Sequence, residues 1–258
     1  MLTNESYHKD TKYVSKSGLD LVNRAPALYY HKYLDPNKPK EEFNEAFLVG
    51  GAFHTFVLEP HLLATEYVVM PDYKGVGSMA KKDEFKRRNA TKNIIPHSIY
   101  MQIDGMTKSV LSHPIASKLF TGGIAEQTHV WIDKDTGVMC KCRPDYTKIV
   151  KKTIVDLKST DDASENGFKR SAIKFRYDVQ SAFYTDGLRA NNFDIENFIF
   201  VAVEKKPPYL VNVFFADTET MEVGREKYKE NLITYAECSF NDEWEGYSEI
   251  IKPLGIEY

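Results

Sequence analysis

The chain has 258 residues, of which 42% are hydrophobic and 28% are charged, with 14 glycines, 11 prolines and 3 cysteines. This composition excludes a disordered chain, a collagen and a disulfide scaffold, and the length predicts one or two domains. The formal net charge is −3, from 34 basic and 37 acidic residues. Affinity for nucleic acid would therefore have to come from a local basic patch.

The cysteines and the N-terminal sequence indicate a cytoplasmic protein. Cys140 and Cys142 are two residues apart on an expected strand, where both would point the same way. Together with Cys238 they are too few for a four-cysteine iron–sulfur cluster, and we expect reduced thiols. No stretch approaches 18 consecutive apolar residues, and residues 1–13 lack the apolar segment of a secretion signal. We therefore expect no contact with a membrane.

The N-terminal part is expected to be helical. A short helix opens near Ser15 and must pause before Pro26, because a residue that precedes proline is pushed out of the helical region. A second short helix carries Tyr29, Tyr30 and Tyr33, and a short strand is expected over 67–70. Residues 72–92 are polar and basic, and they predict a mobile loop or a solvated helix.

Residues 43–58 predict a longer helix that ends at Pro60. Phe47, Gly50, His54 and Val57 follow helical spacing, which places His54 on the apolar stripe. Each of the glycines at 50 and 51 costs about 1 kcal/mol in a helix, which suggests that another backbone or a ligand approaches there. A histidine in this position is more often a satisfied core residue than a metal ligand.

From residue 128 the hydrophobic period changes to two. The pattern predicts a hairpin over 129–132 and 138–143, and a strand over 153–158 that places Thr153, Val155 and Leu157 on one side and Ile154, Asp156 and Lys158 on the other. Two helices (164–174 and 176–191), strands over 198–203 and 209–215, and a final amphipathic helix follow. The sequence thus predicts an α/β fold, with a central mixed sheet flanked by helices and an N-terminal helical region.

Three polar residues on adjoining strands suggest phosphodiester chemistry. Asp145 follows Pro144, which ends the hairpin in this interpretation, and Asp156 and Lys158 lie on the next strand. Two carboxylates about 4 Å apart repel by about 4 kcal/mol at an effective dielectric of 20, so they stay ionised together only with a cation between them. Mg²⁺ fits, held by carboxylates, the Leu157 carbonyl and water. On spacing alone, a surface ladder of Asp and Lys explains the pattern equally well.

The motifs resemble the PD-(D/E)xK nuclease core. Cys142-Arg-Pro-Asp145 followed by Ile154-Val-Asp-Leu-Lys158 carries that resemblance. A wider set is similar to the exonuclease VIII (RecE-type) branch, which is related to the RecB nuclease domain and lambda exonuclease. That set comprises Ser15-Lys-Ser17, Gly50-Gly-Ala-Phe-His54, Glu126, Phe168-Lys-Arg170 and Tyr177-Asp-Val-Gln180-Ser-Ala-Phe-Tyr184, and it runs from about residue 11 to Tyr247.

The resemblance implies roles for individual residues. Asp145, Asp156, His54 and the Leu157 carbonyl would hold Mg²⁺, or Mn²⁺ in its place, and Lys158 would be the catalytic lysine. Gln180 and Tyr184, four apart on one helix face, would order a phosphate or the attacking water. The alternative to this role is a half-buried helix on which Tyr184 serves only in packing. Glu126 matches an acidic position whose metal role is doubtful where His54 is present, so we expect it to support the ligands rather than bind the metal.

The resemblance also suggests DNA contacts. Ser15 and Ser17 begin a helix, where free N–H groups favour an anion, and with Arg24 they would hold a DNA 5′-phosphate. A plain helix cap is the alternative. Lys81, Lys82, Arg87 and Arg88 belong to the basic segment, which either lines a DNA channel or is a solvated face.

The function implied is a Mg²⁺-dependent exonuclease that digests double-stranded DNA ends from 5′ to 3′, leaving 3′ single strands for phage or prophage recombination in a bacterial host. The partners implied are an annealing protein or recombinase, and further copies of the chain in a ring. An inert DNA-end-binding protein and a restriction-type endonuclease are the alternatives. Motif coverage predicts one domain over 1–258, with a helical part over about 1–120, a catalytic core over about 121–240 and a tail over 241–258.

Overall fold

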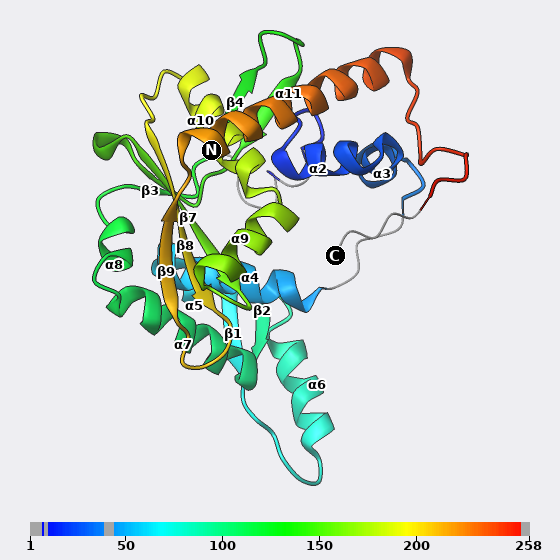
Figure 1. The fold of residues 1–258 in the computed structure, drawn as a ribbon. Coiled ribbons are helices and arrows are strands. Elements are labelled where there is room, and N and C mark those ends of the chain that lie inside the picture. The colour runs from blue at the N-terminus through cyan, green and yellow to red at the C-terminus, as the bar shows by residue number, and fades with distance from the viewer. Residues whose placement is uncertain (1–6, 8–9, 39–43, 254–258) are drawn as a thin grey trace.

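A central five-stranded sheet organises the molecule (Figure 1). The computed structural model describes residue 7, residues 10–38 and residues 44–253; the expected helix start at 43 and the outermost residues of the expected domain lie outside these. The strand order is β3 (Ile124–Ala125), β6 (Tyr146–Lys148), β7 (Thr153–Thr160), β8 (Asn197–Glu204) and β9 (Val211–Phe215). β7 and β8 are parallel and the other neighbours antiparallel. The predicted mixed sheet is confirmed.

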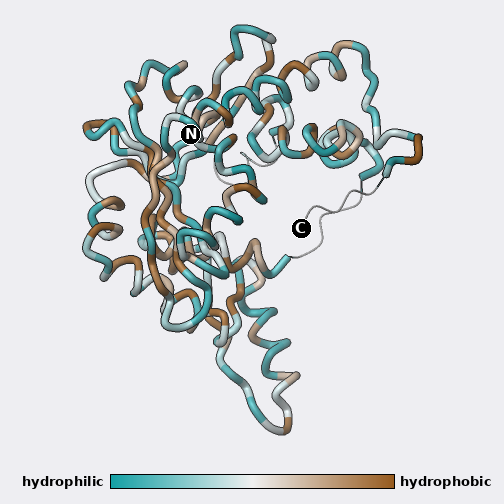
Figure 2. The backbone as a smooth tube through the Cα atoms, viewed as in Figure 1, coloured by the Kyte–Doolittle hydropathy of each residue, from teal (hydrophilic) through white to brown (hydrophobic). Residues whose placement is uncertain are grey.

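Each face of the sheet carries its own hydrophobic core. Val155 and Leu157 of β7 pack on one side with α4 (Glu45–Leu58) and α7 (His97–Ser112). Ile154 packs on the other side with α2 (Lys16–Arg24), α10 (Tyr177–Ala190) and α11 (Thr218–Asn241). The predicted alternation along this strand is confirmed, and the hydropathy colouring shows the sheet as the most hydrophobic layer (Figure 2).

The crossover from β7 to β8 positions the helix that faces the active strand. α9 (Glu165–Lys174) and α10 lie between these parallel strands, as a parallel connection requires. Ser164 accepts a hydrogen bond from Gly167 N and so caps α9. α10 then places Gln180 toward β7, where its side chain reaches Asp156.

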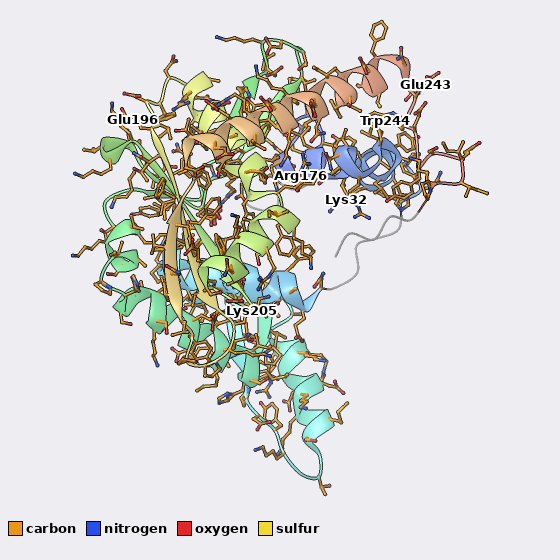
Figure 3. The ribbon with its side chains drawn as sticks, viewed as in Figure 1. Lys32, Arg176, Glu196, Lys205, Glu243 and Trp244 are labelled. Carbon is orange, nitrogen blue, oxygen red and sulfur yellow. The ribbon has the colours of Figure 1, made fainter. Side chains whose placement is uncertain are left out.

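The N-terminal helices pack on the α10 and α11 side. Ala25 is extended before Pro26, which confirms the predicted pause between α2 and α3 (Pro26–Tyr29); a π-helical turn over Tyr30–Leu34 follows. Trp244, which follows α11, stacks on Tyr29 with ring centroids 5.5 Å apart, beside α3 (Figure 3). The chain after α11 is therefore packed against its N-terminal part.

The hairpin was predicted correctly, but its relation to Asp145 was not. β4 (His129–Ile132) and β5 (Met139–Cys142) form a separate two-stranded sheet. Asp145 does not end a strand of this hairpin. It lies directly before β6, a strand that the sequence pattern did not reveal because it has only three residues. Asp145 therefore enters the site from the central sheet.

The segment between α4 and the central sheet contains elements that the pattern missed. α5 (Leu63–Glu66) precedes the predicted strand β1 (Tyr67–Met70), which pairs in parallel with β2 (Asn93–Pro96). α6 (Ser78–Arg88) joins them and has no buried residue, so the solvated-helix alternative for the basic segment is correct. The pattern predicted neither β2 nor α7, and α8 (Ala116–Leu119) follows α7.

The predicted apolar stripe of α4 is wrong in its first half. Phe47 is 77% exposed, and the buried face is made by Ala52, Phe53, Thr55 and Val57. The reason is that the N-terminal end of α4 extends past the sheet (Figure 1). A Cβ on Gly50 would meet no atom within 4 Å, so no backbone approaches it, contrary to one of the two expectations for this pair.

Among the described residues, no single helix has the length and apolar character to cross a membrane. α4 together with residues 60–66 passes that test as a pair bent by 114°.

Candidate active site

Asp145 is fixed to the strand that carries the other motif residues. Its Oδ2 accepts a hydrogen bond of 2.6 Å from Leu157 N on β7, just beyond the N-terminal end of β6. The N–H and C=O of one strand residue point to the same side. The Leu157 carbonyl therefore lies on the Asp145 side of β7, as the predicted metal role requires.

Three candidate metal ligands come together from separate parts of the chain. His54 Nδ1 on α4 lies 3.6 Å from Asp145 Oδ1 and 3.7 Å from Glu126 Oε1. One ligand atom from each residue lies within 4.8 Å of the others. An imidazole and two carboxylates are donors that divalent metals accept. This donor set fits a divalent cation, and the structure places His54 beside Asp145, one of the two carboxylates predicted to share the metal with it.

Glu126 occupies a more central position than the sequence suggested. It adopts a left-handed backbone conformation (φ 50°), and its N–H donates to the Asp145 carbonyl at 3.0 Å. Arg143 Nε donates to its carboxylate at 2.9 Å. Glu126 thus lies among the ligand candidates and is held in place by Arg143. Its carboxylate is about as close to His54 as that of Asp145 is, whereas the sequence predicted only a supporting role for it.

Asp156 and Lys158 form a buried ion pair next to this cluster. Asp156 is fully buried, and its Oδ2 lies 2.5 Å from Lys158 Nζ. Gln180 Nε2 on α10 donates to the other carboxylate oxygen at 2.5 Å. The structure thereby brings together Asp156, Lys158 and Gln180 as predicted. The partner of Gln180 in this structure is the Asp156 carboxylate, and its predicted action on a phosphate or the attacking water stays a prediction.

Burial and neighbouring charges shift the pKa values of the residues in this cluster. Burial, followed by the charge of Asp156, raises the pKa of Asp145 to about 7. Burial alone would lower the pKa of His54, but the charges of Asp145 and Glu126 outweigh it and raise that pKa to about 9. Burial likewise opposes the ionisation of Glu126, yet its contacts with His54 and Arg143 lower its pKa.

Lys158 remains charged in this environment. Burial opposes its charge, but Asp156 and Asp145 outweigh burial and raise its pKa well above the ordinary value. Its ammonium lies 4.9 Å from the centroid of the Tyr177 ring on α10, a cation–π contact. In the sequence, Tyr177 stood out only as part of the motif over residues 177–184. Nothing in its spacing indicated a contact with Lys158.

The other predicted member of α10, Tyr184, follows Gln180 by one turn. It is half-buried, its ring lies 6.5 Å from that of Phe198, and burial raises its pKa well above the ordinary value. Its packing matches the alternative of a half-buried tyrosine, and its role at the site stays a prediction.

Lys16, which the sequence did not single out, lies beside the ion pair. Its ammonium donates to the Phe175 carbonyl at 2.6 Å and lies 2.8 Å from Asp20. Burial lowers its pKa, and the charge of Lys158 acts in the same direction, although Asp20 opposes both. α2 thus adds a second buried cation to the neighbourhood of Lys158.

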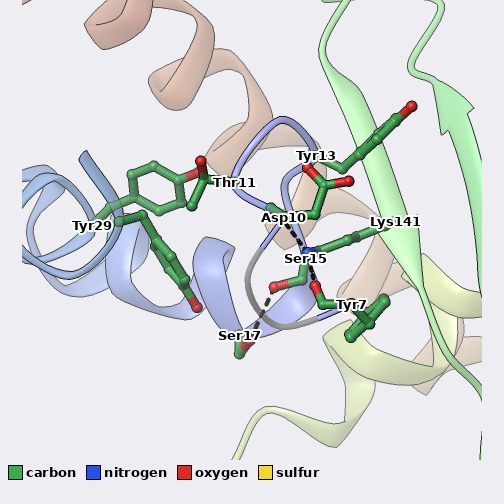
Figure 4. A pocket seen from close by; sticks show the side chains of 9 residues that line it. Tyr7, Asp10, Thr11, Tyr13, Ser15, Ser17, Tyr29 and Lys141 are labelled. Carbon is green, nitrogen blue, oxygen red and sulfur yellow. Dashed lines mark hydrogen bonds between the residues drawn. The ribbon is translucent and has the colours of Figure 1, made fainter. Parts of the chain in front are cut away.

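Of the two serines predicted to hold a phosphate, Ser15 caps α2. Ser15 Oγ accepts a hydrogen bond from Gly18 N and lies 3.0 Å from Ser17 Oγ; both side chains line a small pocket with Tyr29 and Lys141 (Figure 4). Arg24 is exposed at the opposite end of the nine-residue helix. The structure therefore does not bring Arg24 to the serines, and a phosphate role for all three stays a prediction.

The basic residues of the α6 segment lie on an exposed helix. Arg88 pairs with Glu84 of the same helix. Lys81 and Arg87 are exposed and Lys82 is half-buried, and their contact with DNA stays a prediction. Cys140 and Cys142 are buried free cysteines, and Cys238 is a half-buried one.

Comparison with known proteins identifies the family. The model of a family described as a PDDEXK-like domain of unknown function matches residues 15–254. The chain belongs to this PDDEXK-like family. Membership confirms the superfamily that the motif around Asp145, Asp156 and Lys158 indicated. A search of curated proteins found no significant match.

A solved structure has a similar fold. A protein from Eubacterium rectale that carries the provisional name exonuclease is 16% identical, with a TM-score of 0.68 over 99% of this chain and 96% of its own. A phage-related exonuclease from Haemophilus somnus is 11% identical, with a TM-score of 0.37 over 89% of this chain and 96% of its own. The first comparison supports the assignment of this chain to the PDDEXK-like fold.

Proposed function

We propose that this PDDEXK-like chain is a divalent-metal-dependent nuclease that hydrolyses DNA phosphodiester bonds from double-stranded ends. The observation that carries the proposal is the convergence of His54, Glu126 and Asp145 beside the Asp156–Lys158 pair. A surface ladder of Asp and Lys would not bury a carboxylate completely or raise the pKa of another to about 7. Such shifts mark functional sites.

His54, Glu126, Asp145, Asp156 and the Leu157 carbonyl would hold the metal, Mg²⁺ or Mn²⁺ in its place. When bound, such an ion activates water and offsets charge on the phosphate. Glu126 and Asp145 lie within reach of the same ion as His54, whereas Asp156 is already engaged by Gln180 and Lys158.

Lys158 supplies charge rather than a base in this proposal. Its raised pKa keeps the ammonium protonated at neutral pH, and Tyr177 supports it from one side. A protonated lysine can hold a phosphate oxygen and stabilise the negative charge that develops during hydrolysis. Gln180 and Arg143 position the carboxylates, because each donates to one of them.

The finer parts of the proposal follow the resemblance to the RecE-type branch. They are 5′ to 3′ polarity, a recombination role in a phage or prophage with an annealing protein or recombinase, a ring of several copies, and action in the cytoplasm as a single domain. The match to the PDDEXK-like family supports the chemistry. The polarity depends on the motif resemblance alone.

The test is digestion of a linear duplex labelled at one defined end, with 5′-phosphate and 5′-hydroxyl versions, beside a closed circular duplex. We expect loss of label from the linear DNA with Mg²⁺, no digestion with EDTA, and an intact circle. Cutting of the circle would show a restriction-type endonuclease instead. Binding of ends without digestion under any divalent metal would show an inert end-binding protein. Equal digestion of the 5′-phosphate and 5′-hydroxyl duplexes would contradict the proposal that Ser15 and Ser17 hold the 5′-phosphate.

A further inference from the structure

A groove with an aromatic floor lies next to the candidate active site. α9, β9 and the beginning of α11 form its walls, and it encloses about 490 Å³. Phe168 stacks on Phe214 with centroids 4.6 Å apart, and Tyr177 stacks on Phe200 at 5.5 Å. Phe215, at the edge, is 74% exposed. Phe168 and Phe200 of the floor are themselves buried, so the exposed apolar surface of the groove comes from Phe215 and from Ile173 and Val223 on the helices beside it. Exposed apolar side chains gathered in this way mark interaction sites.

The charges around the groove argue against DNA as its occupant. Its lining includes four acidic and two basic side chains: Glu165, Asp178, Asp217, Glu219, Lys169 and Lys227. Asp178 and Lys227 are paired at 2.5 Å, so acidic charge predominates among the rest. Grooves that bind single-stranded nucleic acid combine aromatic platforms with positive charge. This groove suits an apolar segment that carries basic residues.

Such a segment exists on the chain itself. The loop before α6 and α6 together form an arm that projects from the body, and the hydropathy colouring shows a mostly hydrophilic helix (Figures 1 and 2). Residues 72–92 contain seven basic and three acidic side chains. At the outer end Val76 is fully exposed and Met79 is 67% exposed. The arm thus presents apolar side chains within a basic segment.

The arm buries little surface within the described part of its own chain: Phe85 of α6 is half-buried, and its ring lies 6.4 Å from that of Tyr73 in the preceding loop. None of the 11 residues of α6 is buried. Isolated helices of this length are marginal in water, and most helical stability comes from packing an apolar face. A contact with another molecule would therefore add to the stability of α6 by covering its exposed apolar side chains.

We propose that the tip of this arm, Val76 and Met79, docks into the aromatic groove of a second copy of the chain. Apolar side chains meet the aromatic floor, and the lysines of α6 meet the acidic rim. In one molecule the arm points away from the groove (Figure 1), so the occupant is a neighbour's arm. A contact between two different surfaces is head-to-tail and closes into a ring or extends as a filament. The inference deepens the proposed assembly and is independent of the proposed chemistry.

The first test measures the mass of the full-length protein across a concentration series by analytical ultracentrifugation. We expect Val76→Asp with Met79→Asp, or Phe215→Ser alone, to raise the dissociation constant of the assembly about tenfold or more. Val150→Asp and Phe240→Ser are matched controls, because these side chains are 90% and 91% exposed outside both surfaces, and they should leave the mass unchanged. Circular dichroism confirms that each variant folds.

The second test places a photo-crosslinking residue at position 79 in a mixture of ¹⁵N-labelled and unlabelled protein. Crosslinks between labelled and unlabelled copies should map to residues 165–178 or 214–227. Crosslinks elsewhere, or an assembly that the arm variants leave intact, would overturn the docking but not the assembly. A protein that stays monomeric at every concentration would overturn both. Unchanged mass with weakened duplex DNA binding would show that the arm contacts DNA instead.

Discussion

At the scale of single residues, the site holds more protons than its side chains would hold in water. Burial and the charge of Asp156 raise the pKa of Asp145 to about 7, and the charges of Asp145 and Glu126 raise the pKa of His54 to about 9 against the effect of burial, so each group holds its proton to a higher pH than in water. A divalent cation would replace the positive charge of these protons. The metal-free protein is therefore expected to show a characteristic dependence of stability on pH.

The contribution of Asp145 to stability should fall as the pH rises. Its folded-state pKa is raised from 3.8 to about 7, so its proton stabilises the fold fully below pH about 4, and that stabilisation is lost as the pH rises through 7. Asp145→Asn removes this titration. In EDTA, the free energy of unfolding of wild type minus that of the variant should decrease between pH 4.5 and 7.5 in urea titrations. A constant or increasing difference would contradict the assigned environment.

Gln180→Leu tests the support given to Asp156. The variant leaves a buried carboxylate oxygen without its donor, which costs about 1–3 kcal/mol. Gln102→Leu is the matched control, since Gln102 donates at 3.0 Å to a backbone carbonyl that water can reach after the change. Urea unfolding should show the larger loss for Gln180→Leu. Equal losses would show that the contact with Asp156 has no special weight.

The sequence predicted the site residues unevenly, for a physical reason. Asp145, Asp156 and Lys158 are readable because they follow a short motif on strands. The place of Glu126 depends on Arg143 and on a left-handed backbone conformation, which a linear pattern does not show. Tyr177 contacts Lys158 only through the packing of α10 on β7.

At the scale of elements, long runs with clear periods, such as β7 and α10, were predicted. The four-residue strands β1, β4 and β5 were predicted too, whereas the three-residue β6 and the four-residue β2 were not. The 16-residue helix α7 was also missed, so length alone does not decide which elements a pattern reveals. The exposed first half of α4 shows a related failure, because spacing indicates which residues share a face but not where the neighbouring sheet ends.

The contact between α10 and α11 supplies a prediction at this scale. A Cβ on Gly224 would lie 2.0 Å from the Asp178 carbonyl oxygen, which is backbone and cannot move aside cheaply. Gly224→Ala should therefore destabilise the protein by about 1–3 kcal/mol or more. Gly50→Ala, a helical position with open space, should instead add about 1 kcal/mol. Thermal unfolding compares the two, and a stable Gly224→Ala variant would contradict the close packing.

At the scale of the whole molecule, the two cores share one sheet. Val155 and Leu157 belong to one core, and Ile154 between them belongs to the other. Neither core can open without exposing β7. We therefore expect one cooperative unfolding transition, with equal calorimetric and van't Hoff enthalpies. Two separated transitions would contradict the predicted single domain.

The net charge of −3 gave no indication of a nucleic-acid substrate. The structure shows why such a sum informs little: acidic side chains gather at the candidate site and around the groove, and basic ones along α6. The distribution of charge, rather than its total, bears on which molecules each surface meets.

Digestion of linear duplex DNA by wild type and by Lys158→Ala, with and without Mg²⁺, tests the central claim most directly. Lys205→Ala is the matched control, a lysine paired with Asp161 on the surface. The account predicts digestion by wild type and the control only with the metal, and a loss of at least about a hundredfold for Lys158→Ala with the fold intact. Full activity of folded Lys158→Ala, or digestion by wild type in EDTA, would contradict it.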